Sequence, residues 1–211
     1  MRVLHVSCSP RGEASESYRL SQQIINQLRQ SDPDATVIDR VIGQGVIPPI
    51  DEDYAVSQGS SKDVSQLGSM AKSEELIQEL ETADVVVIST PMHNLTLPAT
   101  LKLWIDHIVR TRRTFNISKF GKVGTLQDRP VFVAISSGGR FSGEYPQQPD
   151  FLTPYLTAIL GMIGLHNVAI FSVQGTGSHV NELASIRRNT DQLVREHFAS
   201  FHPDLIAVPT Y

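Results

Sequence analysis

Apolar residues along this chain follow two alternating patterns. Uninterrupted runs, such as VVVIS within residues 84–89 and VFVAIS within residues 130–136, are typical of strands buried on both faces. Between such runs, apolar residues recur three or four positions apart, as at Leu20, Ile24 and Leu28, which indicates helices with one buried face. This alternation predicts an α/β protein with a parallel sheet.

The boundaries of these patterns define the expected elements. Strands are predicted at residues 2–7, 35–41, 84–89, 130–136 and 167–173. Helices are predicted at residues 17–30, 73–81, 98–109, 153–163 and 180–201. Pro98 is expected in a first helical turn, where a missing N–H has no partner to lose. Residues 43–70 are rich in Pro, Gly and Ser, so we expect an irregular segment that covers a site or contacts a partner.

Five strands alternating with five helices predict a three-layer α/β sandwich with a doubly wound sheet. A dinucleotide-binding sheet requires G-x-G-x-x-G after the first strand, but residues 9–17 read SPRGEASES. The Gly-x-Gly pairs at Gly43 and Gly175 lack the third glycine, and no G-x-x-x-x-G-K is present. The motifs therefore argue against dinucleotide and P-loop sites and favour the strand order 2-1-3-4-5.

Composition narrows the class of protein further. The 211 residues are expected to form a single domain, 1–211, and the net charge of −4 gives no sign of nucleic-acid binding. One cysteine, Cys8, fits a reducing compartment. No apolar run approaches the ~20 residues that span a bilayer, and no signal-peptide pattern is present, so we expect a cytoplasmic protein. The histidines lack metal-ligand spacing and no G-x-S-x-G is present, which excludes recognisable metal and hydrolase sites.

Hydroxyl groups dominate the loop that follows the first strand. Ser9, Ser15 and Ser17, with the amides of the following helix N-terminus, are suitable donors for a phosphate monoester. The alternative is an ordinary turn whose serines only cap the helix.

Two further loops lie on the same edge of the predicted sheet. In the order 2-1-3-4-5, the first, third and fourth strands are adjacent, so the serine loop, residues 91–98 and residues 136–139 meet. Gly138 and Gly139 permit close approach of a ligand because they have no Cβ. A phosphate site beside such loops predicts a mononucleotide with a planar ring.

The chain resembles the FMN-dependent NADH-azoreductases, flavodoxin-like relatives of the NAD(P)H-quinone reductases. The resemblance covers nearly the whole chain and is strongest at Ser9 with SES at 15–17, PMHN at 91–94, SSGG at 136–139, LTPYL at 152–156 and LGMIG at 160–164. It implies a flavodoxin-like sheet, bound FMN, NADH or NADPH as electron donor, and a quinone or azo compound as acceptor. It also implies a homodimer whose interface completes each pocket.

The same resemblance assigns the binding residues. It implies that the FMN phosphate is held by Ser9, Ser15, Glu16 and Ser17. It implies that the isoalloxazine is lined by Met92, His93, Asn94, Leu95, Ser136, Ser137, Gly138 and Gly139. We expect the backbone N–H of Asn94 to contact flavin N5, and we assign no side chain as a catalytic residue. The two half-reactions are expected to follow ping-pong kinetics through one site.

Three positions depart from the pattern of this family. His93 stands where Tyr is frequent, Leu95 where Phe is usual, and Met162 where Phe also occurs. These departures leave flavin binding intact as an expectation and bear on the choice of substrate. Two other hypotheses remain at this stage: an FMN electron carrier without turnover of its own, and a nucleotide-sensing module without flavin.

Overall fold

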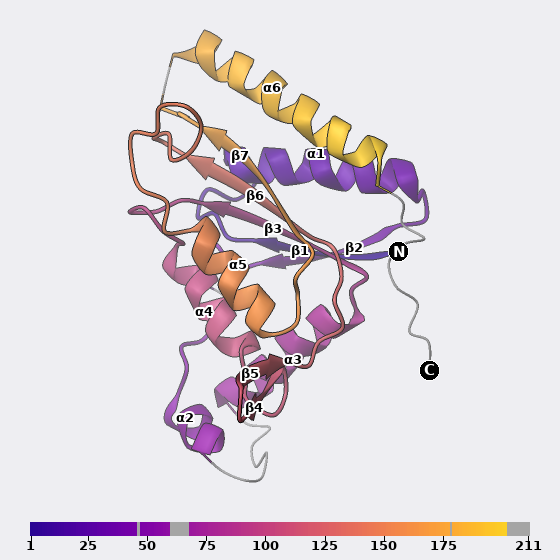
Figure 1. Ribbon diagram of the computed structural model, residues 1–211, viewed down its shortest axis with the longest axis vertical. Coiled ribbons are helices and arrows are strands. Elements are labelled where there is room, and N and C mark those ends of the chain that lie inside the picture. The colour runs from indigo at the N-terminus through magenta and orange to yellow at the C-terminus, as the bar shows by residue number, and fades with distance from the viewer. Residues whose placement is uncertain (46, 60–67, 178, 202–211) are drawn as a thin grey trace.

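A parallel sheet forms the centre of the molecule (Figure 1). The computed structural model describes residues 1–45, 47–59, 68–177 and 179–201. The sheet has the order β2-β1-β3-β6-β7, and its strands are β1 (Arg2–Ser7), β2 (Thr36–Val41), β3 (Val85–Pro91), β6 (Val131–Ser137) and β7 (Val168–Gln174). Counted among the parallel strands alone, this is the predicted order 2-1-3-4-5, which is confirmed.

Helices cover both faces of the sheet and make the predicted third layer (Figure 1). One face carries α1 (Glu16–Ser31) and α6 (Val180–Ala199). The other carries α3 (Gly68–Thr82), α4 (Ala99–Ile108) and α5 (Thr153–Met162). A single 3-10 turn, η1 (Gly12–Ala14), precedes α1. Among the described residues, no helix is long and apolar enough to cross a membrane.

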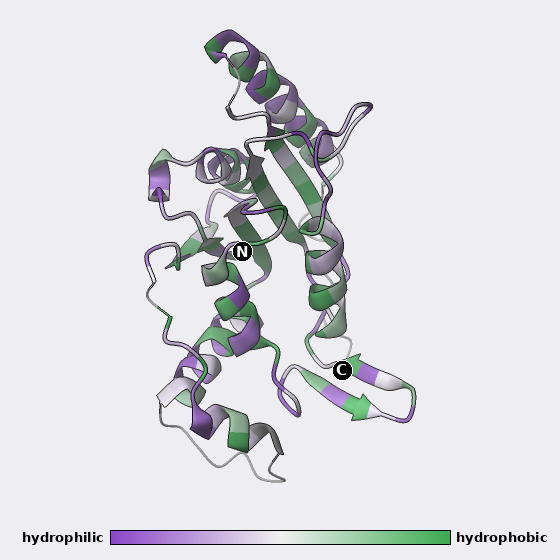
Figure 2. Cartoon of the chain, turned by 90° about the vertical axis from the view of Figure 1, so that its left-hand side faces the viewer, coloured by the Kyte–Doolittle hydropathy of each residue, from purple (hydrophilic) through white to green (hydrophobic). Residues whose placement is uncertain are grey.

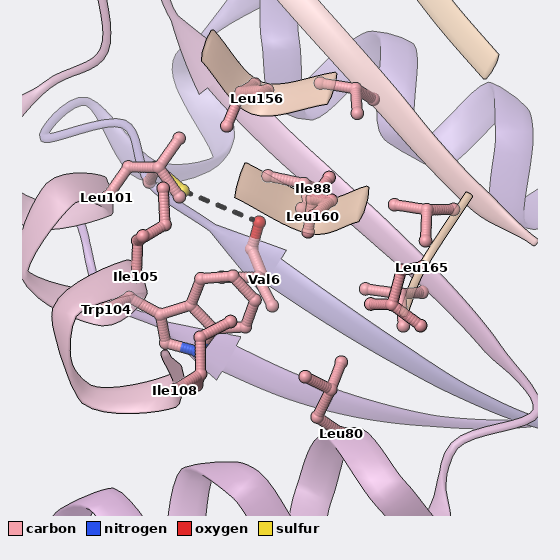
Figure 3. Packing of buried hydrophobic residues seen from close by; sticks show 14 of the residues in the cluster. Val6, Leu80, Ile88, Leu101, Trp104, Ile105, Ile108, Leu156, Leu160 and Leu165 are labelled. Carbon is pink, nitrogen blue, oxygen red and sulfur yellow. Dashed lines mark hydrogen bonds between the residues drawn. The ribbon is translucent and has the colours of Figure 1, made fainter. Parts of the chain in front are cut away.

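The core consists of two clusters, one on each face of the sheet. Because successive strand residues point to opposite faces, Val85 and Val87 pack beneath α1 and α6, whereas Val86 and Ile88 pack beneath the other helices. Figure 3 shows Trp104 of α4 within the cluster on the face covered by α3, α4 and α5. Trp104 is fully buried, so it serves packing rather than ligand contact.

The segment 43–70 differs from its prediction as irregular. It contains α2 (Glu52–Gly59), and α3 already begins at Gly68. Asp51 begins α2 by accepting a hydrogen bond from the Tyr54 amide at 2.9 Å, and its second oxygen accepts the Ser69 amide at 2.9 Å. The Tyr54 hydroxyl donates to the Asp106 carbonyl at 2.8 Å, so α2 packs near the C-terminal end of α4. Residues 60–67 lie outside the described residues, and a covering or partner role stays a prediction.

A short hairpin that the sequence patterns did not predict lies between α4 and β6. It pairs β4 (Phe115–Ser118) with β5 (Gly121–Gly124) and projects from the body of the molecule (Figure 2). Its apolar Ile117 and Phe120 are exposed, which is why no buried pattern marks it. A smaller correction concerns Pro98, which is the N-cap of α4 and not a residue of its first turn.

Candidate functional site

Loops from neighbouring strands are joined at the carboxyl edge of the sheet. The Cys8 amide after β1 donates to the Ser89 carbonyl of β3 at 2.9 Å. The Met92 amide after β3 donates to the Ser136 carbonyl of β6 at 2.7 Å. Parallel strands in this order place their carboxyl ends side by side, so the three loops predicted to share an edge do share it.

The serine loop, residues 9–17, combines a helix cap with one free hydroxyl donor. Ser15 is the N-cap of α1: its Oγ accepts the Tyr18 amide at 3.2 Å and donates to the Gly12 carbonyl at 2.9 Å. Ser9 Oγ accepts the Arg11 amide at 3.2 Å, which leaves its hydroxyl hydrogen available as a donor. Ser17 is fully buried, and its Oγ lies 3.4 Å from that of Ser15. Because the Ser15 hydrogen goes to Gly12, Ser17 is the donor in this contact, and of the three serines Ser9 alone keeps its hydroxyl hydrogen free among the described residues.

Backbone amides add to this donor. Glu16 and Ser17 are the first two residues of α1, so their N–H groups have no acceptor within the helix. The helix dipole places partial positive charge at the same point. This end of the edge can therefore bind a dianionic group without a lysine.

Glu16, which the resemblance assigns to the phosphate, directs its side chain elsewhere. The carboxylate accepts the Arg187 Nε at 2.9 Å and the Arg19 Nε at 3.3 Å. Burial opposes ionisation, but the hydrogen bond and charge of Arg187, and then those of Arg19, hold the pKa of Glu16 below its usual value. Of Glu16, the backbone amide and not the side chain is therefore available to an anion at the start of α1.

The loop after β3 contains a tight turn, residues 93–96. The His93 amide donates to the Thr96 carbonyl at 2.9 Å, and the Thr96 amide donates back to His93 at 3.0 Å. The two central residues, Asn94 and Leu95, have φ values of 47° and 71°. Asn adopts the left-handed region readily, whereas Leu does so at a cost of about 1–2 kcal/mol. Such strain is typical of functional sites whose surroundings hold the backbone in place.

Neighbouring residues hold this turn. The Phe151 amide donates to the Leu95 carbonyl at 3.1 Å, and Thr96 Oγ1 donates to the Phe151 carbonyl at 3.4 Å. Within the part of the chain that the structure describes, the Asn94 and Leu95 amides have no hydrogen-bond acceptor. Asn94 is exposed and Leu95 is half-buried, so the turn lies at the surface. We call these two backbone N–H groups the Asn94–Leu95 donor pair.

The loop after β6 joins the same wall through a residue that the sequence analysis missed. Gln148 Nε2 lies 3.0 Å from Ser137 Oγ and 3.0 Å from the sulfur of Met92. A Cβ on Gly139 would lie 2.5 Å from Gln148 Oε1, so a larger residue there would displace the Gln148 side chain. A Cβ on Gly138 would meet nothing within 4 Å, so Gly138 faces open space. No motif marks Gln148, because its role depends on a loop folding back over the sheet edge.

Gln174 at the end of β7 fixes the start of that loop. Its Oε1 accepts the amides of Phe141 at 2.8 Å and Ser142 at 3.1 Å, and its Nε2 donates to Ser142 Oγ at 2.6 Å. The Thr176 amide donates to the Ser137 carbonyl at 3.0 Å. The predicted residues Ser136 and Ser137 are thus nearly buried, within a wall supported by β7.

Other reactive groups do not compete with this site. Cys8 is completely buried, and burial raises the pKa of its thiol far above the usual range. The described residues contain no cluster of three potential metal ligands. Met162, a predicted substrate neighbour, is the half-buried last residue of α5. A small pocket bounded by Phe132 and His197 also includes Pro130 and Asn167, at the amino ends of β6 and β7, and so lies at the opposite edge.

Known proteins are similar to this chain in both sequence and fold. Residues 1–196 match the family model described as a flavodoxin-like fold. FMN-dependent NADH:quinone oxidoreductase 4 of Pseudomonas fluorescens is 44% identical over 173 residues, which cover 82% of this chain and 84% of the relative. FMN-dependent NADH:quinone oxidoreductase 5 of Burkholderia lata is 43% identical and covers 88% and 90%. The chain belongs to this flavodoxin-like family of quinone oxidoreductases.

Solved structures agree on the fold of this family member. The azoreductase of Bacillus anthracis strain Sterne superposes with a TM-score of 0.82 at 21% identity, covering 95% of this chain and all of that one. An FMN-dependent NADH-azoreductase of Bacillus anthracis strain Ames Ancestor, solved in complex with FMN, gives 0.80 at 23% identity, covering 94% and 98%. At this identity the likeness concerns the fold alone, and it matches the sheet order described above.

Proposed function

We propose that this chain is an FMN-dependent NAD(P)H oxidoreductase that reduces quinones and aromatic azo compounds. One observation carries the proposal: the serine loop and the Asn94–Leu95 donor pair lie on one edge of the sheet, as a phosphate and a planar ring require. The relatives at 43–44% identity are named for FMN, NADH and quinone, which supports the same function and NADH as the donor.

The donor set of the serine loop fits the phosphate of FMN. We assign to it the Ser9 hydroxyl and the backbone amides of Glu16 and Ser17, whereas the hydroxyls of Ser15 and Ser17 donate to Gly12 and Ser15 and belong to the helix cap. A further candidate donor is the buried hydroxyl of Ser89 in β3, which is in register with Ser7 at the end of β1 and has no partner among the described residues. A buried unpaired hydroxyl costs about 1–3 kcal/mol, so a polar group or water is expected to complete it.

The wall of the edge fits the isoalloxazine. Bound FMN would supply the hydride and electron transfer that amino-acid side chains cannot. The chain would supply position: Met92 and the Ser136–Gly139 backbone line the ring, and the Asn94 and Leu95 amides donate to its heteroatoms, with Asn94 on the side of N5. His93 is exposed beside the turn and contributes a hydrogen-bonding side chain without acting as an acid.

A single site is proposed to serve both half-reactions. The nicotinamide and the acceptor would occupy the same open face beside Gly138 in turn, which gives ping-pong kinetics. Initial rates measured at several acceptor concentrations should give parallel double-reciprocal lines against NADH. Intersecting lines, with a required ternary complex, would contradict the single-site scheme.

Each pocket is further proposed to be completed by a second copy of the chain. The exposed sides of α4 and α5, beside the open edge, are the candidate interface. The chain is also proposed to form one domain and to act in the cytoplasm. Sedimentation at decreasing concentration should show a dimer whose dissociation parallels loss of turnover. A fully active monomer would overturn the shared pocket.

Colour is the direct test of the function. The purified or FMN-reconstituted protein should be yellow and should bleach anaerobically on addition of NADH. Protein that stays colourless after reconstitution would overturn the proposal. Yellow protein that neither NADH nor NADPH reduces would indicate an electron carrier instead.

A further inference from the structure

An acidic residue occupies the first position of the helix that is assigned to the phosphate. Glu16 lies between Ser15 and Ser17, so its charge is within one residue of the proposed dianion. Like charges at this separation repel, and a free carboxylate there would oppose FMN binding. Binding of FMN here therefore requires a nearby positive charge that neutralises the Glu16 carboxylate.

The last helix, α6, provides this positive charge. Arg187, from α6, reaches Glu16 from 171 positions along the chain and forms a fork: Nε contacts one carboxylate oxygen at 2.9 Å and Nη2 contacts the other. A two-point contact of this kind fixes the direction of the carboxylate as well as its charge. The Glu16 side chain is 17% exposed, so solvent screens it only in part.

Two more residues complete the charge balance. Arg19, one turn along α1, contacts Glu16 at 3.3 Å and also binds both oxygens of Asp191 at 3.0 and 3.1 Å. The network thus holds two guanidinium groups and two carboxylates, with no net charge. Without Arg187, Glu16 retains a single long contact to an arginine that Asp191 already engages.

We propose that Arg187 is a positioning residue of the phosphate site, which turns and neutralises the Glu16 carboxylate so that the start of α1 accepts a phosphate. This inference rests on the proposed function, since it presumes FMN as the ligand. It gives α6, which lies outside the serine loop, an indirect role in retaining the cofactor.

The test is the dissociation constant of the apoprotein for FMN, measured by quenching of flavin fluorescence. Arg187→Gln should weaken FMN binding about tenfold at low salt, and less as salt is raised, because the effect is electrostatic. Riboflavin has the same ring without the phosphate, so its affinity should not change. Arg195→Gln, an exposed arginine on the same helix, removes the same formal charge and should leave FMN binding as it is.

A second variant separates electrostatics from helix packing. Glu16→Gln/Arg187→Gln removes the carboxylate that Arg187 neutralises, so FMN affinity should return to that of the unaltered chain. Equal weakness of the double and single variants, or equal loss for riboflavin, would overturn the inference in favour of a structural link between α1 and α6. Unchanged FMN affinity in Arg187→Gln would also overturn it. Failure of the unaltered chain to bind FMN would instead refute the proposed function.

Discussion

The serine loop and the turn at residues 93–96 offer donors on the same edge of the sheet by different means. The serine loop uses the buried Ser9 hydroxyl and helix amides that are placed by local geometry, with Ser15 capping α1. The turn offers two backbone amides without an acceptor among the described residues, in a left-handed conformation that contacts from Phe151 hold in place. A phosphate needs charge complementarity, whereas a planar ring needs a rigid wall, and the two constructions match these needs.

Removal of the free hydroxyl donor should produce the largest effect. Ser9→Ala deletes one charge-assisted hydrogen bond to the proposed phosphate, worth about 1.5–3 kcal/mol, so FMN should bind about 10- to 100-fold more weakly. Flavin fluorescence quenching measures the change, with riboflavin as the control ligand. An equal loss for riboflavin would show that the serine loop does not distinguish the phosphate.

The wall beside the turn should be less sensitive. Gln148→Ala removes the contacts to Ser137 and Met92, and we expect a loss of about 1 kcal/mol in the free energy of unfolding and a few-fold fall in kcat/KM for the quinone. Urea unfolding and steady-state kinetics report the two effects. Gln147→Ala, which removes the exposed side chain of the neighbouring residue, is the matched control. A fall in FMN affinity as large as that of the serine variant would contradict the division of roles.

Backbone strain separates the two regions further. Asn94→Leu places a second leucine at a positive φ, so the free energy of unfolding should fall by about 1 kcal/mol. Asn94→Gly, which tolerates the same φ, should change it much less. Because Asn94 is exposed, loss of packing does not complicate the comparison. Equal stability of the leucine and glycine variants would show that the turn relaxes.

Acidification should lower the stability of the protein slightly through Glu16, which belongs to the serine loop and not to the turn. The lowered pKa of Glu16 means that its ion pairs add stability above the ordinary glutamate pKa of about 4.3, and that this stability is lost as pH falls through the lowered value. Thermal unfolding followed from pH 6 downward should show a shallower decline for Glu16→Gln. Identical pH profiles for the two proteins would rule out this contribution.

Several elements followed from the sequence because their patterns are local. The strands β1, β3 and β6 are buried on both faces, and a continuous apolar run is the direct signature of that environment. The serine loop was recognisable for the same reason: its cap, its hydroxyls and the helix that follows are contiguous. By contrast, α2 depends on Asp51 bonding to α3, and the hairpin β4–β5 has exposed apolar residues, so neither leaves a readable pattern.

The sequence by itself was enough to predict the sheet order and the edge where the three loops meet, because continuous apolar runs mark the strands and each loop follows its strand directly. Only the tertiary structure decided where their side chains point and which distant groups hold them. It turned Glu16 away toward Arg187, brought Gln148 against Ser137, and held Leu95 at a positive φ through Phe151. Each of these depends on a group distant in sequence, whose direction is set by packing and charge pairing in the folded chain.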